Sequence, residues 1–438
     1  MGLAALTIDG VGNMLGSGIY GLVGKAAGIM GNAVWLAFAG SMVAALLTGL
    51  SYACIGSRYP RAAGAAYVTH RAYRWPYLSY LVGLAVAASG LTSMATASRV
   101  VSGFFQDLGV ALPTPVLVVA FLLLVAAVVY RGMRESTWMN IVCTTIEVLG
   151  LVIVVAVGLR YWGSVNYMET PPRPEGSAGS LGVVLVLNGA VLTFFSFIGV
   201  EDLLNVTEEV KDPRRTLPIA LIGALIVGTV IYMSVSITAV SVLHYSTLAE
   251  SKSALVDVVR TAAPWFPPLL FTAISIFAVS NTALLNFVMG SRLLYGMSRQ
   301  RLLPTRLGKV HPVRRTPHVA IAVLLVVVVT LALSGDIREL AEATALLLLG
   351  VFCVVNTALI LLKYRKDEPR GAFEVPAAVP AAGVLVCLAL IGARLFGTGA
   401  DFKAPMIAGG IGVFVTVLYF ITRPRNVLME EQPITEEV

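Results

Sequence analysis

The chain has 438 residues, of which 57% are hydrophobic and only 13% are charged, and its mean hydropathy is +0.85. Soluble proteins have about 45–50% apolar and about 25% charged residues, so this composition excludes a soluble globular enzyme, a disordered chain and a fibrous protein. The formal net charge of +7 comes from basic residues in short loops between apolar runs. Membrane topology explains that placement better than nucleic-acid binding does.

Twelve apolar runs are long enough to form membrane-spanning helices, which need about 20 residues each. Long continuous runs favour helices over a barrel, whose strands are ~10 residues of alternating polarity. We therefore expect an all-α integral membrane protein. The predicted spans are 3–30, 33–57, 76–106, 114–130, 137–162, 181–208, 216–243, 265–298, 317–334, 337–363, 376–397 and 404–422.

The distribution of Lys and Arg predicts that both termini are cytoplasmic. In that orientation the inner loops and the tail hold 21 of the 31 basic residues, and such a bias marks cytoplasmic loops. Two loops are expected to be structured. The first carries a short interfacial helix over 62–74, and the second carries an amphipathic outer helix over 247–264 that Pro264 ends.

The first span contains a cluster of glycines, namely Gly10, Gly12, Gly16 and Gly18. Glycine costs ~1 kcal/mol relative to alanine inside a helix, so a cluster at mid-span indicates either close helix packing or a deliberate break. A break leaves backbone N–H groups free in a low-dielectric place. An anionic group of a substrate at the start of a half-helix would satisfy them.

The sixth span favours the break. Gly199 lies in the middle of this run, and Glu201 and Asp202 follow it after one intervening residue. Carboxylates at membrane depth are costly and are functional candidates by default. The first and sixth spans are thus both interrupted and lie five spans apart, the pattern that indicates a transporter site between two inverted repeats.

This pattern predicts four parts of the chain. Residues 1–162 and 181–363 would form the first and second inverted repeats of five spans each. Residues 376–422 would carry the last two spans, and residues 423–438 an acidic cytoplasmic tail.

At this point the chain resembles the amino acid–polyamine–organocation (APC) superfamily of amino acid transporters. The resemblance covers essentially the whole chain, and its most specific stretch is the sixth span. The matching stretches are GNMLGSGIYGLVGKAAG (12–28), YPRAAGAAYV (59–68), FFSFIGVEDLLNVTEEVKDPRRTLPIAL (194–221) and SRLLYGMSRQRLLP (291–304). The resemblance implies the five-plus-five inverted-repeat (LeuT-like) fold with discontinuous spans one and six.

The resemblance also implies where a substrate binds. Backbone N–H groups of residues 17–19 would bind a carboxylate. Carbonyl groups of Met14, Phe195 and Ile198 would bind an amino group, and Phe195 would gate the site. The implied substrate-binding residues are Met14, Gly16, Ser17, Gly18, Ile19, Phe195, Ile198, Gly199 and Glu201.

Three positions depart from the family pattern. Ala65-Ala66 replaces a glycine pair in the first inner loop, and residues 299–301 replace an Arg-Asp-Gly sequence. Both changes lie in expected gating or inner-loop regions, so we expect them to affect conformational control more than substrate binding. The third is Glu147 in the fifth span, where several relatives place a lysine whose ammonium occupies the sodium position of sodium-coupled members.

We expect Glu147 to couple transport to protons, because an unpaired carboxylate in an apolar setting takes up a proton near neutral pH. The alternative is a structural ion pair with Lys25 or Arg99. Asp9 is a further candidate for an inner gate or ion path, or is simply a carboxylate near the surface. The candidate coupling residues are Glu147, Asp9, Gly12, Leu15, Ser280, Asn281 and Thr282.

Other chemistry finds no support in the sequence. The histidines lack zinc-ligand spacing, there is no Walker motif, and Ser, His and Asp are too scattered to nominate a triad. We expect no enzymatic activity, no metal site and no cofactor other than H⁺ or Na⁺ as a coupling ion. Asp202 is a candidate partner for a cationic substrate, and residues proposed to line the pocket walls are Thr92, Ser93, Asn281 and Asn356.

The sequence thus predicts a secondary transporter of an amino acid or related amine in the cell membrane, working by alternating access. Within this class, sodium coupling or obligate exchange is the alternative to proton coupling. From a different class, a channel or a membrane sensor is the alternative. A channel should conduct without saturation, whereas a transporter should show saturable counterflow.

Overall fold

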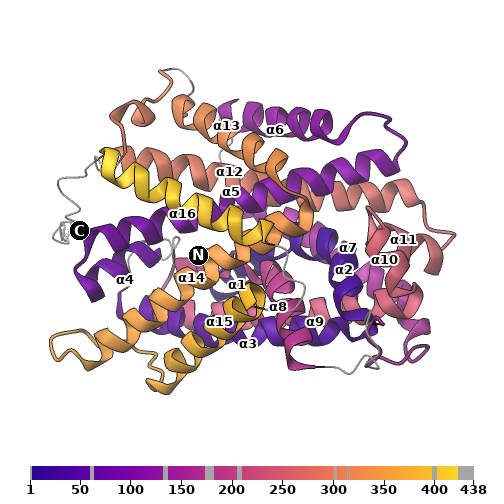
Figure 1. Cartoon of the computed structure of the whole chain (residues 1–438), viewed down its shortest axis with the longest axis horizontal. Helices are drawn as coiled ribbons and strands as arrows, with labels where there is room; N and C mark the ends of the chain where they lie inside the picture. The colour runs from indigo at the N-terminus through magenta and orange to yellow at the C-terminus, as the bar shows by residue number, and fades with distance from the viewer. Residues whose placement is uncertain are drawn as a thin grey trace.

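A computed structural model of the chain is entirely helical in the residues that it describes (Figure 1). Its first helices, α1 (Leu3–Met14) and α2 (Ser17–Met30), lie in the first predicted span, and α3 (Val34–Arg58) follows a short 3₁₀ turn. The described residues are 2–59, 64–131, 137–172, 182–204, 210–299, 303–312, 314, 316–396 and 402–422. The predicted tail 423–438 lies outside them, as do Gln300 and Arg301.

The remaining long helices follow the predicted spans closely. They are α5 (Pro76–Asp107), α6 (Thr114–Arg131), α7 (Thr137–Gly158), α8 (Val183–Phe194), α9 (Pro213–Val242), α12 (Pro268–Arg299), α13 (His318–Ser334), α14 (Ile337–Tyr364), α15 (Ala378–Phe396) and α16 (Lys403–Thr422).

Ten helical stretches among the described residues are long and apolar enough to cross a membrane. One of them, residues 17–58, has 42 residues. At 1.5 Å per residue a straight helix of this length would extend about 63 Å, twice the ~30 Å hydrocarbon core. Gly31 at its 3₁₀ turn has a φ of 65°, so the stretch is divided into α2, which completes the first predicted span, and α3, which forms the second. The total of twelve spans stays a prediction.

Short helices lie at the two ends of the bundle (Figure 1). The predicted interfacial helix is α4 (Gly64–Tyr73) at one end. At the other end the predicted single outer helix over 247–264 is wrong. It is divided into α10 (Tyr245–Glu250) and α11 (Ala254–Ala262), because Ser251 is extended and its hydroxyl donates to Asp257 Oδ2 (2.6 Å).

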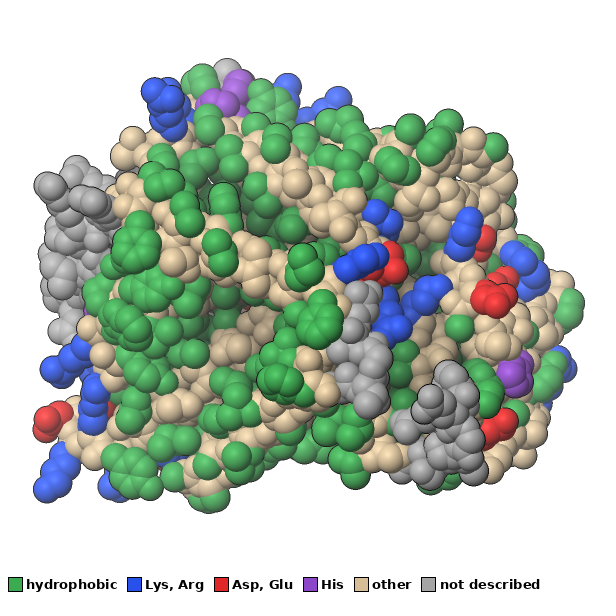
Figure 2. Space-filling view, in the orientation of Figure 1, with side chains coloured by type: hydrophobic (Ala, Val, Ile, Leu, Met, Phe, Trp, Pro, Cys, Tyr) green, Lys and Arg blue, Asp and Glu red, His purple; other side chains and the backbone are tan. Residues whose placement is uncertain are grey.

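The outer surface of the bundle is apolar. Figure 2 shows hydrophobic side chains spread over the left and central parts of one face, with charged side chains at the left and upper edges and across the right-hand part. Helix α16 contributes exposed Val413, Phe414 and Phe420, each more than 60% exposed. Such a surface suits contact with lipid, because apolar side chains have no reason to avoid a hydrocarbon solvent.

The loop between α14 and α15 joins distant parts of the chain. Arg58, at the end of α3, donates two hydrogen bonds of 2.7 Å to Glu374, and Lys363 donates a third of 2.7 Å. Partial burial raises the pKa of Glu374, but the hydrogen bonds from Arg58 and Lys363 outweigh it and lower this pKa to about 2. Glu368 of the same loop accepts hydrogen bonds from Arg71 and Tyr59 (both 2.7 Å).

Candidate functional site

The first span is interrupted where the glycine cluster predicted. Helix α1 ends at Met14, and α2 begins at Ser17. Between them Gly16 has a φ of 121°, and a Cβ on Gly16 would overlap Thr282 Oγ1 on α12. Only glycine combines this backbone conformation with so close an approach.

The start of α2 has no side-chain cap. Its first intrahelical hydrogen bond runs from the Tyr20 N–H to the Gly16 carbonyl (3.1 Å). The N–H groups of residues 17–19 therefore lie before the first helical bond, and a helix leaves such groups unsatisfied unless something else accepts from them. With the helix dipole they make this end of α2 attractive to an anion.

The sixth predicted span is interrupted as well. Helix α8 ends at Phe194, a 3₁₀ turn covers Phe195–Phe197, and Ile198 is extended. Gly199 has a φ of 108°, and a second 3₁₀ turn covers Val200–Leu204. The predicted residues 205–208 at the end of this span lie outside the described residues.

The two interruptions pack against each other. A Cβ on Gly199 would lie 2.5 Å from the Asn13 carbonyl oxygen, and one on Gly18 would lie 2.7 Å from Ser196 Cα. The buried Tyr232 of α9 lies across the junction, and its hydroxyl is 2.7 Å from the carbonyl oxygens of both Met14 and Ser196. A single tyrosine thus connects both broken segments.

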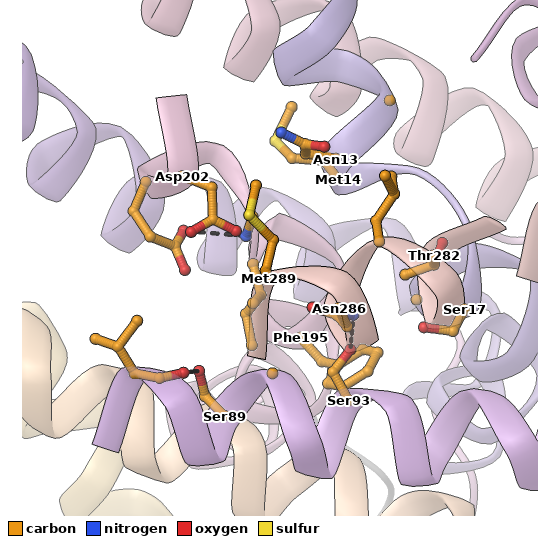
Figure 3. Close-up of a pocket in the computed structure, with 18 residues that line it drawn as sticks. Asn13, Met14, Ser17, Ser89, Ser93, Phe195, Asp202, Thr282, Asn286 and Met289 are labelled. Carbon is orange, nitrogen blue, oxygen red and sulfur yellow. Dashed lines mark hydrogen bonds between the residues drawn. The ribbon is translucent and has the colours of Figure 1, made fainter. Parts of the chain in front are cut away.

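A cavity opens at this junction (Figure 3), enclosing about 670 Å³ of space when the solvent at its mouth is counted. Of the nine predicted substrate-binding residues, seven line it, whereas Gly16 and Ile19 do not. The lining residues are Gly12, Asn13, Met14, Ser17, Gly18, Val86, Ser89, Gly90, Ser93, Phe195, Ile198, Gly199, Glu201, Asp202, Thr282, Leu285, Asn286 and Met289.

The cavity has a polar lining of two kinds. The uncapped start of α2 borders it at Ser17 and Gly18, while Glu201 and Asp202 supply carboxylates. The lining residues include no Lys, Arg or His. Glu201 is only 8% exposed, and its Oε2 accepts a hydrogen bond from the Gly199 N–H (3.0 Å). Glu201 therefore caps the second break, in contrast to the uncapped start of α2.

Helices α5 and α12 form the opposite wall. Asn286 Nδ2 donates to Ser93 Oγ (3.4 Å), and Figure 3 shows this contact beside Phe195. Ser93 was predicted to line the pocket, but Ser89 and Asn286 were not. Their positions at three- and four-residue spacing on polar helix faces were the available signal.

Three other predictions for the pocket wall are wrong. Thr92 is not among the lining residues and accepts a hydrogen bond from Thr344 (2.7 Å). Asn356 is fully buried and donates to Thr48 (3.0 Å). Asn281 faces Glu147 instead. Each residue is polar and at a suitable depth, but the sequence does not set the rotation of its helix.

Glu147 lies beside the cavity on α7 and is fully buried. Its Oε1 accepts a hydrogen bond from Asn281 Nδ2 (2.9 Å), while its Oε2 has no hydrogen-bond partner among the described residues. The alternative of an ion pair is wrong for both predicted partners. Lys25 donates to the Ala249 carbonyl and Arg99 to the Ala332 carbonyl.

The other predicted coupling residues are divided. Gly12 and Thr282 line the cavity, and Thr282 Oγ1 donates to the Leu15 carbonyl (3.2 Å). Ser280 and Asp9 are half-buried and lie outside the cavity lining. In the described part of the chain no three His, Cys, Asp or Glu side chains are grouped so that they could hold a metal ion.

Comparison with known proteins agrees with this architecture. The family model described as amino acid permease matches residues 1–427. A branched-chain amino acid permease of Bacillus subtilis is 27% identical over 89% of this chain and 87% of its own length. Cationic amino acid transporter 4 of Mus musculus is 29% identical over 84% of this chain and 60% of its own length.

A methylthioribose transporter of Bacillus subtilis is 27% identical over 87% of this chain and 86% of its own length. An uncharacterized transporter of Mycobacterium tuberculosis is 30% identical over 89% of this chain and 85% of its own length. With a match that covers nearly every residue, and two interrupted spans that meet at a cavity, the chain belongs to the amino acid permease family.

Proposed function

We propose that this protein is a secondary transporter that carries an amino acid or a related amine across the cell membrane by alternating access. The observation that carries the proposal is the uncapped start of α2, whose free N–H groups border a cavity. The charged side chains among the lining residues of this cavity are the carboxylates of Glu201 and Asp202. Such a site suits a solute with one negative and one positive end.

The two ends of a zwitterion have different partners in this cavity. Its carboxylate would accept hydrogen bonds from the N–H groups of residues 17–19 at the start of α2. Its ammonium would donate to carbonyl oxygens at the breaks, at Met14, Phe195 and Ile198, with the Glu201 carboxylate nearby. Backbone groups then recognise what all amino acids share, and the α5–α12 wall selects the side chain.

Binding is tested by thermal unfolding of purified protein with matched ligands. For each amino acid the panel includes the amine that lacks the carboxylate and the acid that lacks the amino group. A ligand that binds the folded state raises the melting temperature. If the substrate is an amino acid, we expect the melting temperature to rise only with ligands that carry both charged ends. An equal rise with the amine alone would assign an amine substrate. If neither the amino acids nor the amines raise the melting temperature, the proposal is overturned.

Transport is tested in proteoliposomes by counterflow, in which an unlabelled internal solute drives uptake of the labelled one. Saturable counterflow is expected of a transporter. Uptake that does not saturate and shows no counterflow would support a channel instead. Obligate exchange would appear as uptake that requires internal substrate at every pH.

We further propose that transport is coupled to protons through Glu147. The side chain of Glu147 is completely buried, and its Oε2 has no hydrogen-bond partner among the described residues. Both observations support this role, because a charged carboxylate costs far more free energy in such a place than a neutral carboxylic acid does. Both termini are proposed to be cytoplasmic, and residues 1–162 and 181–363 to be the two inverted repeats. In the transport cycle the broken first and sixth spans close around the substrate, and a bundle of four helices rocks against the rest.

The coupling is tested with Glu147→Gln, which keeps the shape and removes the titration. Proton coupling predicts that wild-type uptake in sodium-free medium rises with an inward proton gradient and that the variant loses this dependence. Glu250→Gln serves as the matched control, because Glu250 is an exposed carboxylate at the end of α10 (Tyr245–Glu250). An unchanged pH profile in Glu147→Gln, or uptake that needs sodium, would reject proton coupling.

A further inference from the structure

Two buried polar atoms on one face of α7 have no hydrogen-bond partner among the described residues. They are Glu147 Oε2, in a side chain that is 0% exposed, and Thr144 Oγ1, in one that is 2% exposed. Residues three apart on a helix are neighbours on its surface. Buried polar groups are nearly always satisfied, so each exception needs an explanation, and here two exceptions lie one turn apart.

The Thr144 hydroxyl lies directly against α1. A Cβ on Gly12 would overlap Thr144 Oγ1, so the close approach depends on the missing side chain. Gly12 also lines the substrate cavity. Gly12 therefore borders both the cavity and the Thr144 hydroxyl.

The other oxygen of the carboxyl is fixed in place. Asn281 Nδ2 donates to Glu147 Oε1, and the next residue of α12, Thr282, lines the cavity. A hydrogen bond to only one oxygen orients the carboxyl and leaves Oε2 as the atom that is able to carry a proton.

The groups around Glu147 are uncharged at neutral pH. Tyr20 of α2 donates its hydroxyl to the Glu147 carbonyl oxygen (2.8 Å), and among the described residues Tyr232 of α9 and Cys143 of α7 also lie near this carboxyl. The described Lys, Arg and His side chains form no ion pair with Glu147. No neighbouring cation thus competes with a proton for this site.

We propose that Thr144 is the residue through which protons pass between the cavity and Glu147 Oε2, and that Asn281 is a positioning residue that holds the carboxyl for this transfer. The hydroxyl gives its proton to Oε2 as its oxygen takes one from a hydronium ion in the cavity, so the carboxylate becomes a carboxylic acid, the hydronium becomes neutral water and Thr144 is unchanged. Release reverses both transfers. This inference rests on the proposed coupling through Glu147.

The first test uses Thr144→Val, which keeps the shape against Gly12 and removes the hydroxyl. Uptake driven by a proton gradient should fall on the order of tenfold, the equivalent of one hydrogen bond. Counterflow at acidic symmetric pH, where the carboxyl keeps its proton throughout, should be unchanged. Thr144→Ser should restore gradient-driven uptake. Thr145→Val is the matched control, because Thr145 is exposed on the other face of α7.

The second test uses Asn281→Leu. This substitution removes the Asn281 amide, a hydrogen-bond donor that stabilises the carboxylate form of Glu147. Glu147 should therefore hold its proton to higher pH. The midpoint of pH-dependent uptake should therefore move upward by about one pH unit, the equivalent of ~1.4 kcal/mol. A merely structural role would reduce the amount of folded protein without moving this midpoint.

The outcomes separate the inference from the function on which it rests. If Glu147→Gln keeps the wild-type pH profile, the coupling itself is wrong, and the inference with it. If Glu147→Gln abolishes the profile but Thr144→Val behaves like Thr145→Val and Asn281→Leu keeps the wild-type midpoint, only the inference is overturned. Should Thr144→Val fold poorly, Thr144→Ala removes the same hydroxyl without adding volume and gives the same reading.

Discussion

Replacing Ser17 by proline removes one backbone N–H from the start of α2. Proline is well tolerated at the first helical position, because its N–H is not needed by the helix and its φ suits that position. Ser17 occupies this position in α2. If the N–H groups of residues 17–19 hold a substrate carboxylate, one charge-assisted hydrogen bond of three is lost. Such a bond contributes roughly 1.5–3 kcal/mol, which corresponds to a dissociation constant about 10–150-fold higher.

The assay is substrate titration of purified Ser17→Pro by calorimetry, with the apparent melting temperature as a check on folding. Ser17→Ala is the matched control, because it removes the hydroxyl and keeps the N–H. We expect Ser17→Ala to bind nearly as the wild type does and Ser17→Pro to bind much more weakly, with similar melting temperatures. Equal affinities of Ser17→Pro and Ser17→Ala would refute the assignment of the α2 start as the carboxylate site.

Three further predictions concern the frame around the site. Gly199→Ala should lower the stability by roughly 1–3 kcal/mol, because a side chain at a φ of 108° is strained and its Cβ would lie 2.5 Å from the Asn13 carbonyl oxygen; an unchanged apparent melting temperature would contradict this. Tyr232→Phe should lower both the melting temperature and the substrate affinity, measured as above, because the two breaks lose their shared hydroxyl; wild-type affinity would mean that this bridge does not shape the site. Because the pKa of Glu374 is depressed to about 2, its contribution to stability is complete above the unfolded value of ~4.3 and is lost only as pH falls toward 2. Glu374→Gln should therefore lower the melting temperature by the same amount at pH 6 and pH 8, and a difference that grows between these values would count against the Arg58 pairing.

The two breaks were predictable because their cause is local. Glycine clusters and mid-span carboxylates are visible in the sequence, and the φ values of Gly16 and Gly199 agree with them. The helix boundaries followed from the lengths of apolar runs in the same way. These features depend on the properties of consecutive residues, which is the information that a single sequence carries best.

The pocket wall was harder because it depends on how helices rotate against each other. Thr92 and Ser93 are adjacent and both polar, yet only Ser93 reaches the cavity. The pairing of Glu147 with Asn281 joins residues 134 positions apart, and a partner at such a separation has no local signal. The division of the outer segment at Ser251 was missed for another reason, since the hydrogen bond to Asp257 replaces a helical turn without any proline or glycine.

The ion pair between Arg58 and Glu374 has a consequence for how the chain is made. Arg58 is only 7% exposed, and its partner Glu374 is 316 residues further along the chain. At ~5–20 residues per second, a ribosome needs roughly 15–60 s to reach that partner. During synthesis Arg58 of α3 therefore lacks the carboxylate of Glu374 for this time. In a chain truncated before residue 374, the guanidinium would interact with water or lipid headgroups instead. The packing of the first helices is in this way completed only when the last sixth of the chain has been synthesised.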